Sequence, residues 1–450
     1  MSDKKFEIYN ADCIEQMKKM IKEGVLLDSI VCDPPYHLQS IVKRFSKTSV
    51  DDDTQTSQNA SSHAMGRLSK GFMGKEWDGG DIAFRVETWK LMYELLKPGG
   101  HLIAFSGTRT YHRMACAIED SGFEIRDQLG WMYGTGFPKS QNISKFIDKS
   151  KGLEREVIGV KPGHEEFVNR KTKGDTVFKD GMEGFDRPWM HDERKELYHM
   201  ETASNSEEAK QWDGWGTALK PAWEPIVLAR KPLSEDTIVD NILKHGVGGL
   251  NIDGCRVHLD GDKKQYTAGN RTEKWGVMEG GCSYEKGTGA VYTETGRWPA
   301  NIIHDGSDEV ISAFPKSKGQ LGKAKNGGKK NGEVFGDFKE NVTYNPEPRG
   351  DSGSAARFFY SAKATKEDRA SSKHPTVKPV SLMRHLCKLV TPPGGIVMDP
   401  FAGSGTTLQA AIEEGFYPIG IEREKEYFDD ITNRLNKMTI KRKLTDFYEE

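Results

Sequence analysis

The stretch Asp399-Pro400-Phe401-Ala402-Gly403-Ser404-Gly405-Thr406-Thr407 decides the fold, because it joins a predicted buried strand to a predicted helix. A predicted strand over 395–399 leads into it, and residues 406–414, with apolar positions at helical spacing, lead out of it. Glycines between a strand and a helix let the main chain approach a ligand closely. The pattern therefore predicts a ligand-binding turn in an α/β fold.

The next predicted strand ends at an acid, Glu422, and an acid in this place can bind the hydroxyl groups of a ribose. The turn has neither a G-x-G-x-x-G pattern nor a Walker lysine, so a dinucleotide or a triphosphate fits poorly. Asp399 beside the glycines also disfavours a polyanion. A nucleoside with a cationic group fits better, and an ordinary tight turn without a ligand is the alternative.

A second motif, Asp33-Pro34-Pro35-Tyr36, follows a predicted strand at 29–32. The two prolines have no N–H, so the main chain here offers carbonyl acceptors, and Asp33 adds a carboxylate. Such a corner suits a group that donates two hydrogens, namely an exocyclic amine. Tyr36 offers a flat face to a base taken out of its stack. The alternative is a structural proline turn after a strand.

The ends of the chain alternate between strands and helices, and the centre does not. Further helices are predicted at 82–96, 108–120, 380–390 and 424–438, and further strands at 101–105 and 417–421. Residues 123–133 fit either a strand or part of a hairpin. From about 151 to 350 the periodic stretches are short, and Gly, Lys, Asp, Glu and Asn dominate. This contrast predicts two ordered parts that flank an irregular one.

The composition excludes several classes of protein. No run of about 18 apolar residues is present, and no apolar segment of a secretory signal follows the N-terminus, so we expect a cytoplasmic protein without membrane contact. The six cysteines include no C-x-x-C pair, and the 12 histidines include no H-x-x-x-H, so neither disulfides nor a metal are expected. The net charge of −2 leaves nucleic-acid binding open, because local charge decides it.

Together the two motifs resemble those of the S-adenosylmethionine-dependent amino methyltransferases of DNA. The catalytic tetrad of that family resembles Asp33 to Tyr36, its cofactor signature resembles Asp399 to Thr407, and the order resembles the circularly permuted β group. Four more stretches are similar to family segments, the last two to those of phage and prophage members: Asn10-Ala11-Asp12-Cys13, His374-Pro375-Thr376-Val377-Lys378-Pro379, Trp131-Met132-Tyr133-Gly134-Thr135-Gly136-Phe137-Pro138-Lys139-Ser140 and Gly296-Arg297-Trp298-Pro299-Ala300-Asn301.

The resemblance implies a Rossmann-like, seven-stranded, mostly parallel sheet with helices on both faces. It implies a catalytic half in 1–150, an irregular α+β target-recognition region in 151–350 and a cofactor-binding half in 351–450. It further implies S-adenosylmethionine as the cofactor, double-stranded DNA as the partner and no metal, and it allows a homodimer.

The implied site residues fall into three groups. The catalytic residues are Asp33, Pro34, Pro35 and Tyr36. The cofactor-binding residues are Asp12, Cys13, Asp33, Thr376, Lys378, Asp399, Phe401, Gly403, Ser404, Gly405, Thr406, Thr407 and Glu422, with Asp12 near the adenine and Thr376 and Lys378 on the methionine side. The DNA-binding residues are Tyr36, Arg109, Lys139, Lys316, Lys318, Lys323, Lys325, Lys329 and Lys330.

Some of the DNA-binding residues have an equally plain structural interpretation. Residues 316–330 hold these six lysines and no acid, which suits either phosphate contacts or a solvated loop. Arg109 stands before a predicted helix, where it can contact a phosphate or lie in solvent.

The first residue of the tetrad bears on the substrate. Asp is usual there in adenine-N6 enzymes and Ser in cytosine-N4 enzymes, so the resemblance implies methylation of a flipped adenine at N6, with cytosine N4 as the alternative. A methyltransferase that acts on RNA or protein, or a DNA-binding protein without catalysis, is a further alternative. C5 methylation is disfavoured because it needs a cysteine nucleophile and no Pro-Cys pair occurs.

Overall fold

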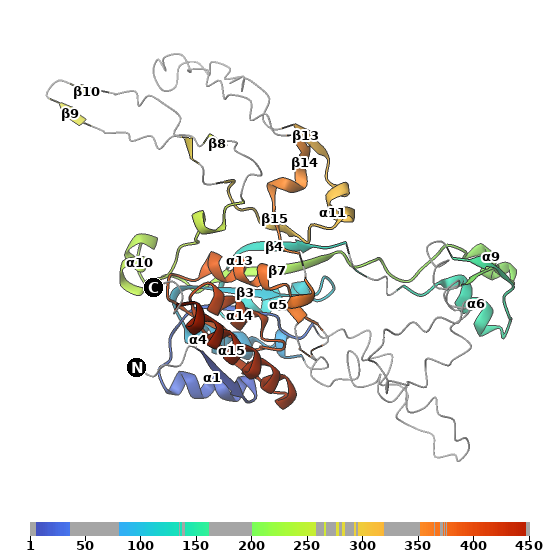
Figure 1. Cartoon of the computed structure of the whole chain (residues 1–450), viewed down its shortest axis with the longest axis horizontal. Helices are drawn as coiled ribbons and strands as arrows, with labels where there is room; N and C mark the ends of the chain where they lie inside the picture. The colour runs from blue at the N-terminus through green and yellow to red at the C-terminus, as the bar shows by residue number, and fades with distance from the viewer. Residues whose placement is uncertain are drawn as a thin grey trace. The chain divides into compact units, whose positions relative to one another are not determined.

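The computed structural model divides the chain into two compact units, Met1–Gly134 with Trp223–Glu450, and Thr135–Ala222 (Figure 1). The residues that it describes are 6–36, 81–134, 136, 140–161, 200–257, 265–266, 276–278, 281–283, 292–293, 296–318, 352–363, 365–369, 372, 374 and 376–446.

The first unit is built on a nine-stranded sheet with the order β1-β17-β16-β2-β3-β7-β4-β12-β15. Its strands are β1 Glu7–Asn10, β2 Leu27–Cys32, β3 Leu96–Phe105, β4 Glu124–Met132, β7 Trp223–Arg230, β12 Ile302–His304, β15 Tyr360–Ser361, β16 Ile396–Asp399 and β17 Tyr417–Glu422. Neighbouring strands are parallel except at β7, which is antiparallel to both β3 and β4. The predicted α/β fold with a mostly parallel sheet is confirmed, and β12 and β15 extend it beyond seven strands.

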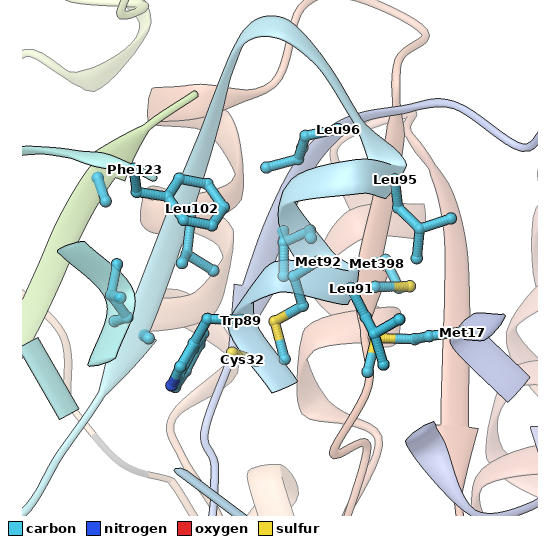
Figure 2. Close-up of a cluster of buried hydrophobic side chains, with 14 of the residues drawn as sticks. Met17, Cys32, Trp89, Leu91, Met92, Leu95, Leu96, Leu102, Phe123 and Met398 are labelled. Atoms are coloured by element: carbon cyan, nitrogen blue, oxygen red, sulfur yellow. The ribbon is translucent and has the colours of Figure 1, made fainter. Parts of the chain in front are cut away.

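Helices cover both faces of this sheet. The main ones are α1 Cys13–Lys22, α4 Val86–Leu95, α5 Tyr111–Asp120, α13 Val380–Val390, α14 Thr406–Glu413 and α15 Lys425–Asp446. Side chains alternate between the two faces along each strand. Ile30 and Cys32 of β2 therefore pack in the cluster that contains α1, α4 and α5, whereas Val31 packs in the cluster that contains α13 and α14. Figure 2 shows Cys32 in the first cluster, with Met17 of α1 and Trp89 of α4.

Shorter elements complete the first unit. They are η3 Ile82–Phe84, α10 Ile238–His245, η6 Asp253–Cys255, β8 Gln265–Tyr266, β9 Gly276–Met278, β10 Gly281–Ser283, β11 Tyr292–Thr293, α11 Asp308–Ala313, β13 Lys316–Lys318, β14 Ser352–Ser354, η7 Ala355–Phe358 and α12 Lys366–Arg369. No helix in the described part of the chain has the length and apolar character needed to cross a membrane.

Some predicted elements have other bounds in the structure. The helix predicted over 82–96 ends at Leu95, and β3 already begins at Leu96, so Lys97-Pro98-Gly99-Gly100 lies inside a strand. The register with β2 shifts there, which accommodates the proline and the glycines. The stretch predicted as a strand or a hairpin contains β4, Glu124–Met132, which pairs with β7 although the whole second unit lies between them in the sequence.

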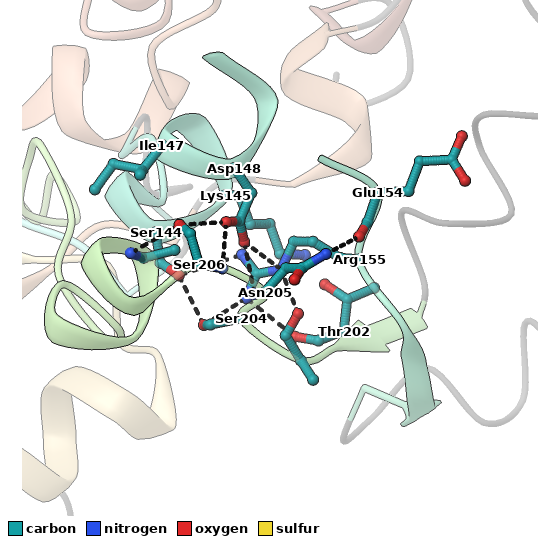
Figure 3. A network of polar contacts seen from close by, with 12 residues as sticks. Ser144, Lys145, Ile147, Asp148, Glu154, Arg155, Thr202, Ser204, Asn205 and Ser206 are labelled. Atoms are coloured by element: carbon teal, nitrogen blue, oxygen red, sulfur yellow. Dashed lines mark hydrogen bonds and ion pairs between the residues drawn. The ribbon is translucent and has the colours of Figure 1, made fainter. Parts of the chain in front are cut away.

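The second unit holds α6 Ile143–Ser150, β5 Val157–Val160, β6 Met200–Thr202 and α9 Glu207–Gln211. Its centre is polar (Figure 3): the buried Asp148 carboxylate accepts hydrogen bonds from the main-chain N–H groups of Asn205 and Ser206, each at 3.0 Å. Arg155 lies 3.6 Å from Asp148 and donates to the Ala203 carbonyl. The compact units differ from the boundaries predicted at 150 and 350, because β7 and β12 of that stretch belong to the main sheet.

Candidate active site

The two sequence motifs lie at the same edge of the main sheet. Asp33 directly follows β2, and Asp399 ends the neighbouring parallel strand β16. Glu422 ends β17, where it is paired with Asn10 of β1. Open α/β sheets bind ligands at the carboxyl ends of their parallel strands, so this edge is the candidate site.

The turn after β16 depends on two glycines with positive φ. Gly403 has φ +53°, and its N–H donates to Glu422 Oε2 at 2.8 Å. A Cβ at Gly403 would lie 3.3 Å from His374 Nε2. Gly405 has φ +75°, and a Cβ there would lie 2.9 Å from Ile431 of α15. The turn therefore packs closely against Ile431 at Gly405 and against His374 at Gly403.

Two buried carboxyl groups border this turn. Burial raises the pKa of Asp399 to about 7, against the opposing hydrogen bonds from Thr407 and from the Phe401 N–H. Burial also raises the pKa of Glu422, whose two oxygens accept from the N–H groups of Gly403 and Glu424. Each carboxylate oxygen retains a further lone pair, so Glu422 can still accept from the hydroxyl groups of a ribose.

The remaining residues predicted to bind the cofactor lie in the stretch 399–407, at the start of α1 or at Thr376. Asp12 is exposed and caps α1, with Oδ1 accepting from the N–H groups of Ile14 and Glu15. Cys13 is buried, which raises the pKa of its thiol to about 12. Ser404 Oγ and Thr406 Oγ1 lie 2.8 Å apart. Thr407 is buried, Phe401 is half-buried and Thr376 is exposed.

The two oxygens of the Asp33 carboxylate have different surroundings. Oδ2 accepts a hydrogen bond from Lys378 Nζ at 2.6 Å. Oδ1 is buried, and the described residues place no donor within hydrogen-bonding distance of it. A buried acceptor without a partner costs about 1–3 kcal/mol, so such an atom calls for a functional explanation.

Lys378 connects Asp33 to a second carboxylate. Its Nζ lies 3.2 Å from Glu224 Oε2 and donates to Tyr36 Oη at 3.3 Å. Burial opposes the charge of Lys378, but Asp33 and Glu224 outweigh burial and raise the pKa of Lys378 above its ordinary value. The sequence analysis placed Lys378 on the cofactor, and the structure places its ammonium group on Asp33.

Tyr36 and Glu224 complete this cluster. The Tyr36 hydroxyl donates to Glu224 Oε2 at 3.2 Å, and the Tyr36 carbonyl accepts from Thr110 Oγ1 at 3.2 Å. Burial, followed by the charges of Asp33 and Glu224, raises the pKa of Tyr36. Sequence reasoning missed Glu224. The available signal was an acid in front of the apolar run 226–229, within a stretch of otherwise irregular composition.

The predicted DNA-binding residues are only partly described. Arg109 is exposed in the turn before α5, and Lys316 is exposed in β13. Lys318 is described by its main chain alone. Lys139, Lys323, Lys325, Lys329 and Lys330 lie outside the described residues. In the ranges that the structure describes, no three His, Cys, Asp or Glu side chains gather so as to hold a metal ion.

The segment 374–378 links the two motifs. His374 is buried against Gly403, and Lys378 four residues later binds Asp33. Burial lowers the pKa of His374, which favours the neutral form of its ring. The arrangement combines a glycine turn that a ligand can approach, a buried acid for hydroxyl groups, and one open carboxylate oxygen that can accept from an amine.

Comparisons with known proteins agree with this chemistry. A sequence model of the family N6_N4_Mtase, described as DNA methylase, matches residues 27–433. The type II methyltransferase M.HindIII of Haemophilus influenzae is 23% identical over 443 residues, which cover 95% of this chain and 94% of the relative.

Two solved structures are similar at low scores. The M1.HpyAVI–SAM complex has a TM-score of 0.38 and 16% identity, and the alignment covers 96% of this chain and 99% of that one. PvuII DNA methyltransferase (cytosine-N4-specific) has a TM-score of 0.35 and 12% identity, and the alignment covers 94% of this chain and 84% of that one.

Proposed function

The chain belongs to the N6/N4 family of DNA methylases, and on that premise we propose that it moves a methyl group to the N6 amine of an adenine flipped out of duplex DNA. The Asp33 Oδ1 atom carries this proposal, since it is a buried acceptor just after β2 to which no described residue donates a hydrogen bond. An amine nitrogen that donates to it satisfies the orphaned oxygen and is held in place for reaction.

Asp33 and the neighbouring main chain act through hydrogen bonding. When Asp33 Oδ1 and the Pro34 carbonyl accept the two amine hydrogens, the nitrogen lone pair is less delocalised into the ring. The nitrogen then becomes tetrahedral more easily as it attacks in line, and the negative carboxylate favours the positive charge that develops on it. Tyr36 stacks on the base, held by hydrogen bonds at its hydroxyl and its carbonyl.

The cofactor is S-adenosylmethionine, which supplies the methyl group as a sulfonium donor. The residues present fit it: the Gly403 N–H holds Glu422 Oε2 at 2.8 Å, and Glu422 at the end of β17 keeps lone pairs that can bind ribose hydroxyls. Asp12 lies at the end of the adjacent β1 and is assigned to the adenine side. The buried Asp399 places negative charge near a cationic ligand when it is ionised.

We assign recognition of the target DNA sequence to residues 151–350. These residues would contact base edges, and Lys316 and its neighbouring lysines would contact phosphates. Arg109, exposed beside the catalytic corner in the turn before α5, is assigned a phosphate contact.

Product analysis tests the proposal. The protein is expressed in a host without DNA methylation, and its DNA is digested to nucleosides and analysed by mass spectrometry. N6-methyldeoxyadenosine is expected. N4-methyldeoxycytidine in its place would support the cytosine alternative, and unmethylated DNA would contradict both.

A further inference from the structure

The cluster around Lys378 contains two more ion-pairing groups than the methyl-transfer chemistry requires. Asp33, Pro34 and Tyr36 suffice to orient an amine, yet Lys378 and Glu224 are packed against them from two other parts of the fold. The Lys378 side chain is 12% exposed and that of Glu224 is 19% exposed. Burying two charges is costly unless their geometry serves a purpose.

The topology explains why Lys378 meets Asp33 and why Glu224 meets Lys378. Glu224 is the second residue of β7, and β7 runs antiparallel to its neighbours, so its first residues lie at the edge where the parallel strands end. Lys378 precedes α13, whose first N–H, that of Val380, donates to the Asp368 carboxylate at 3.0 Å. Rigid elements on both sides thus hold the two groups beside Asp33.

From these contacts we infer that Lys378 and Glu224 are positioning residues for the catalytic carboxylate. Lys378 Nζ donates a hydrogen bond to Asp33 Oδ2 and thereby leaves Oδ1 free to accept one from the substrate amine. Glu224 forms an ion pair with the same ammonium group at 3.2 Å. It also accepts a hydrogen bond from Tyr36 Oη, so the stacking ring is held by the same cluster. This inference rests on the proposed function, because it assigns the purpose of the Asp33 orientation.

The charges support the assignment. Asp33 and Glu224 are two partly buried acids around one partly buried ammonium group, so the cluster keeps one net negative charge when all three are ionised. That charge lies where the amine nitrogen becomes positive during transfer. With Lys378 alone, the pair with Asp33 would be neutral and this electrostatic assistance would be weaker.

The test measures single-turnover methyl transfer by the full-length protein on duplex DNA that carries its target. Lys378→Met should lower the rate about a hundredfold and leave the dissociation constant of S-adenosylmethionine within about twofold. Lys378→Arg should recover at least tenfold of that loss, because a guanidinium group can also bridge two carboxylates. Weaker cofactor binding with an unchanged saturated rate would overturn the inference and return Lys378 to the cofactor.

Glu224→Gln gives an independent measurement, since the amide keeps the size of the side chain. A loss of about tenfold in the saturated rate is expected, and a wild-type rate would overturn the role of Glu224. If Glu224 acts through Lys378, then Glu224→Gln combined with Lys378→Met should be no slower than Lys378→Met alone. Multiplied losses would show two separate structural roles. If Lys378→Met does not fold, Lys378→Arg and Glu224→Gln decide the matter.

Lys244→Met is the matched control. Lys244 pairs with Glu235 at 2.6 Å, the same separation as Lys378 and Asp33, but the pair is on α10 and its flanking loop, away from the cluster. Its loss should leave the transfer rate unchanged. A wild-type protein that makes no N6-methyladenine would refute the proposed function, whereas variants that match an active wild type would refute only this inference.

Discussion

Asp33 and Asp399 have similar positions in the sequence pattern but different surroundings in the structure. Each is followed by proline at the carboxyl end of a buried strand, and their strands, β2 and β16, are neighbours. Asp399 is 2% exposed and satisfied by its own turn, whereas Asp33 keeps one oxygen without a described donor. The comparison teaches that an Asp-Pro after a strand marks the edge of the site, while the partners of the carboxylate decide whether it holds the protein or a ligand.

The largest expected effect separates the two aspartates by rate. Asp33→Asn keeps the shape of the side chain but replaces an accepting oxygen, so methyl transfer should fall at least about a thousandfold. Cofactor affinity should change little, because Asp33 holds Lys378 and the amine rather than the glycine turn. Single-turnover kinetics and equilibrium cofactor binding measure the two effects, and full activity in this variant would contradict the assignment.

The second expected effect is a pH dependence of the free energy of unfolding that Asp399 causes. The pKa of Asp399 is raised by burial to about 7, against an ordinary 3.8, so the folded protein binds this proton more tightly than the unfolded chain does. The corresponding stabilisation is complete below about pH 4 and is lost as the pH rises through 7, and it amounts to about 4 kcal/mol.

Asp399→Asn should remove this dependence, because the amide is neutral at every pH. Urea unfolding of the wild type and the variant at pH 5 and pH 9 tests it: the wild type should lose free energy of unfolding between the two pH values that the variant keeps, so the variant should gain relative to the wild type. A constant difference between the two proteins would argue against a protonated Asp399.

A third comparison concerns the two glycines of the turn. Gly405→Ala places a Cβ 2.9 Å from Ile431 at φ +75°, so the free energy of unfolding should fall by about 2–3 kcal/mol. Gly403→Ala meets His374 Nε2 at 3.3 Å, and the fall should be about 1 kcal/mol, with a larger loss in cofactor affinity. Denaturant unfolding measures the stability of both variants, and titration measures their affinity for the cofactor. Equal losses of affinity in the two variants would contradict a separate role for Gly403 in cofactor binding.

The smallest expected effect concerns the Tyr36 hydroxyl. Tyr36→Phe keeps the ring and loses the contacts with Glu224 and Lys378, so the saturated rate should fall less than about tenfold. Tyr36→Leu removes the aromatic face and should cost more. If the two variants are equally slow, stacking on this ring does not contribute.

The sequence predicted the part of the fold in which local pattern and tertiary structure agree. The apolar runs before Asp33 and Asp399 form β2 and β16, and the helix expected at 380–390 is α13. These runs are buried on both faces of a parallel sheet, which makes them continuous and easy to recognise. The turn at 403–405 was predictable for a similar reason, because positive φ demands glycine.

What the sequence did not show depends on contacts over long distances. Glu224 reaches the Lys378 ammonium group only because β7 is inserted antiparallel between β3 and β4, and nothing local to 223–230 specifies that place. Lys378 is likewise 345 residues from Asp33 in the chain. A residue type can therefore be assigned to a motif from sequence, whereas its partner follows from strand order and direction.

The most direct test of the account is a crystal structure of the protein with S-adenosylhomocysteine and a duplex that contains its target base. The account predicts an adenine outside the helix with its N6 about 2.7–3.2 Å from Asp33 Oδ1 and Lys378 still bound to Oδ2. An extruded base whose amine contacts other groups, with Oδ1 facing only protein, would contradict it.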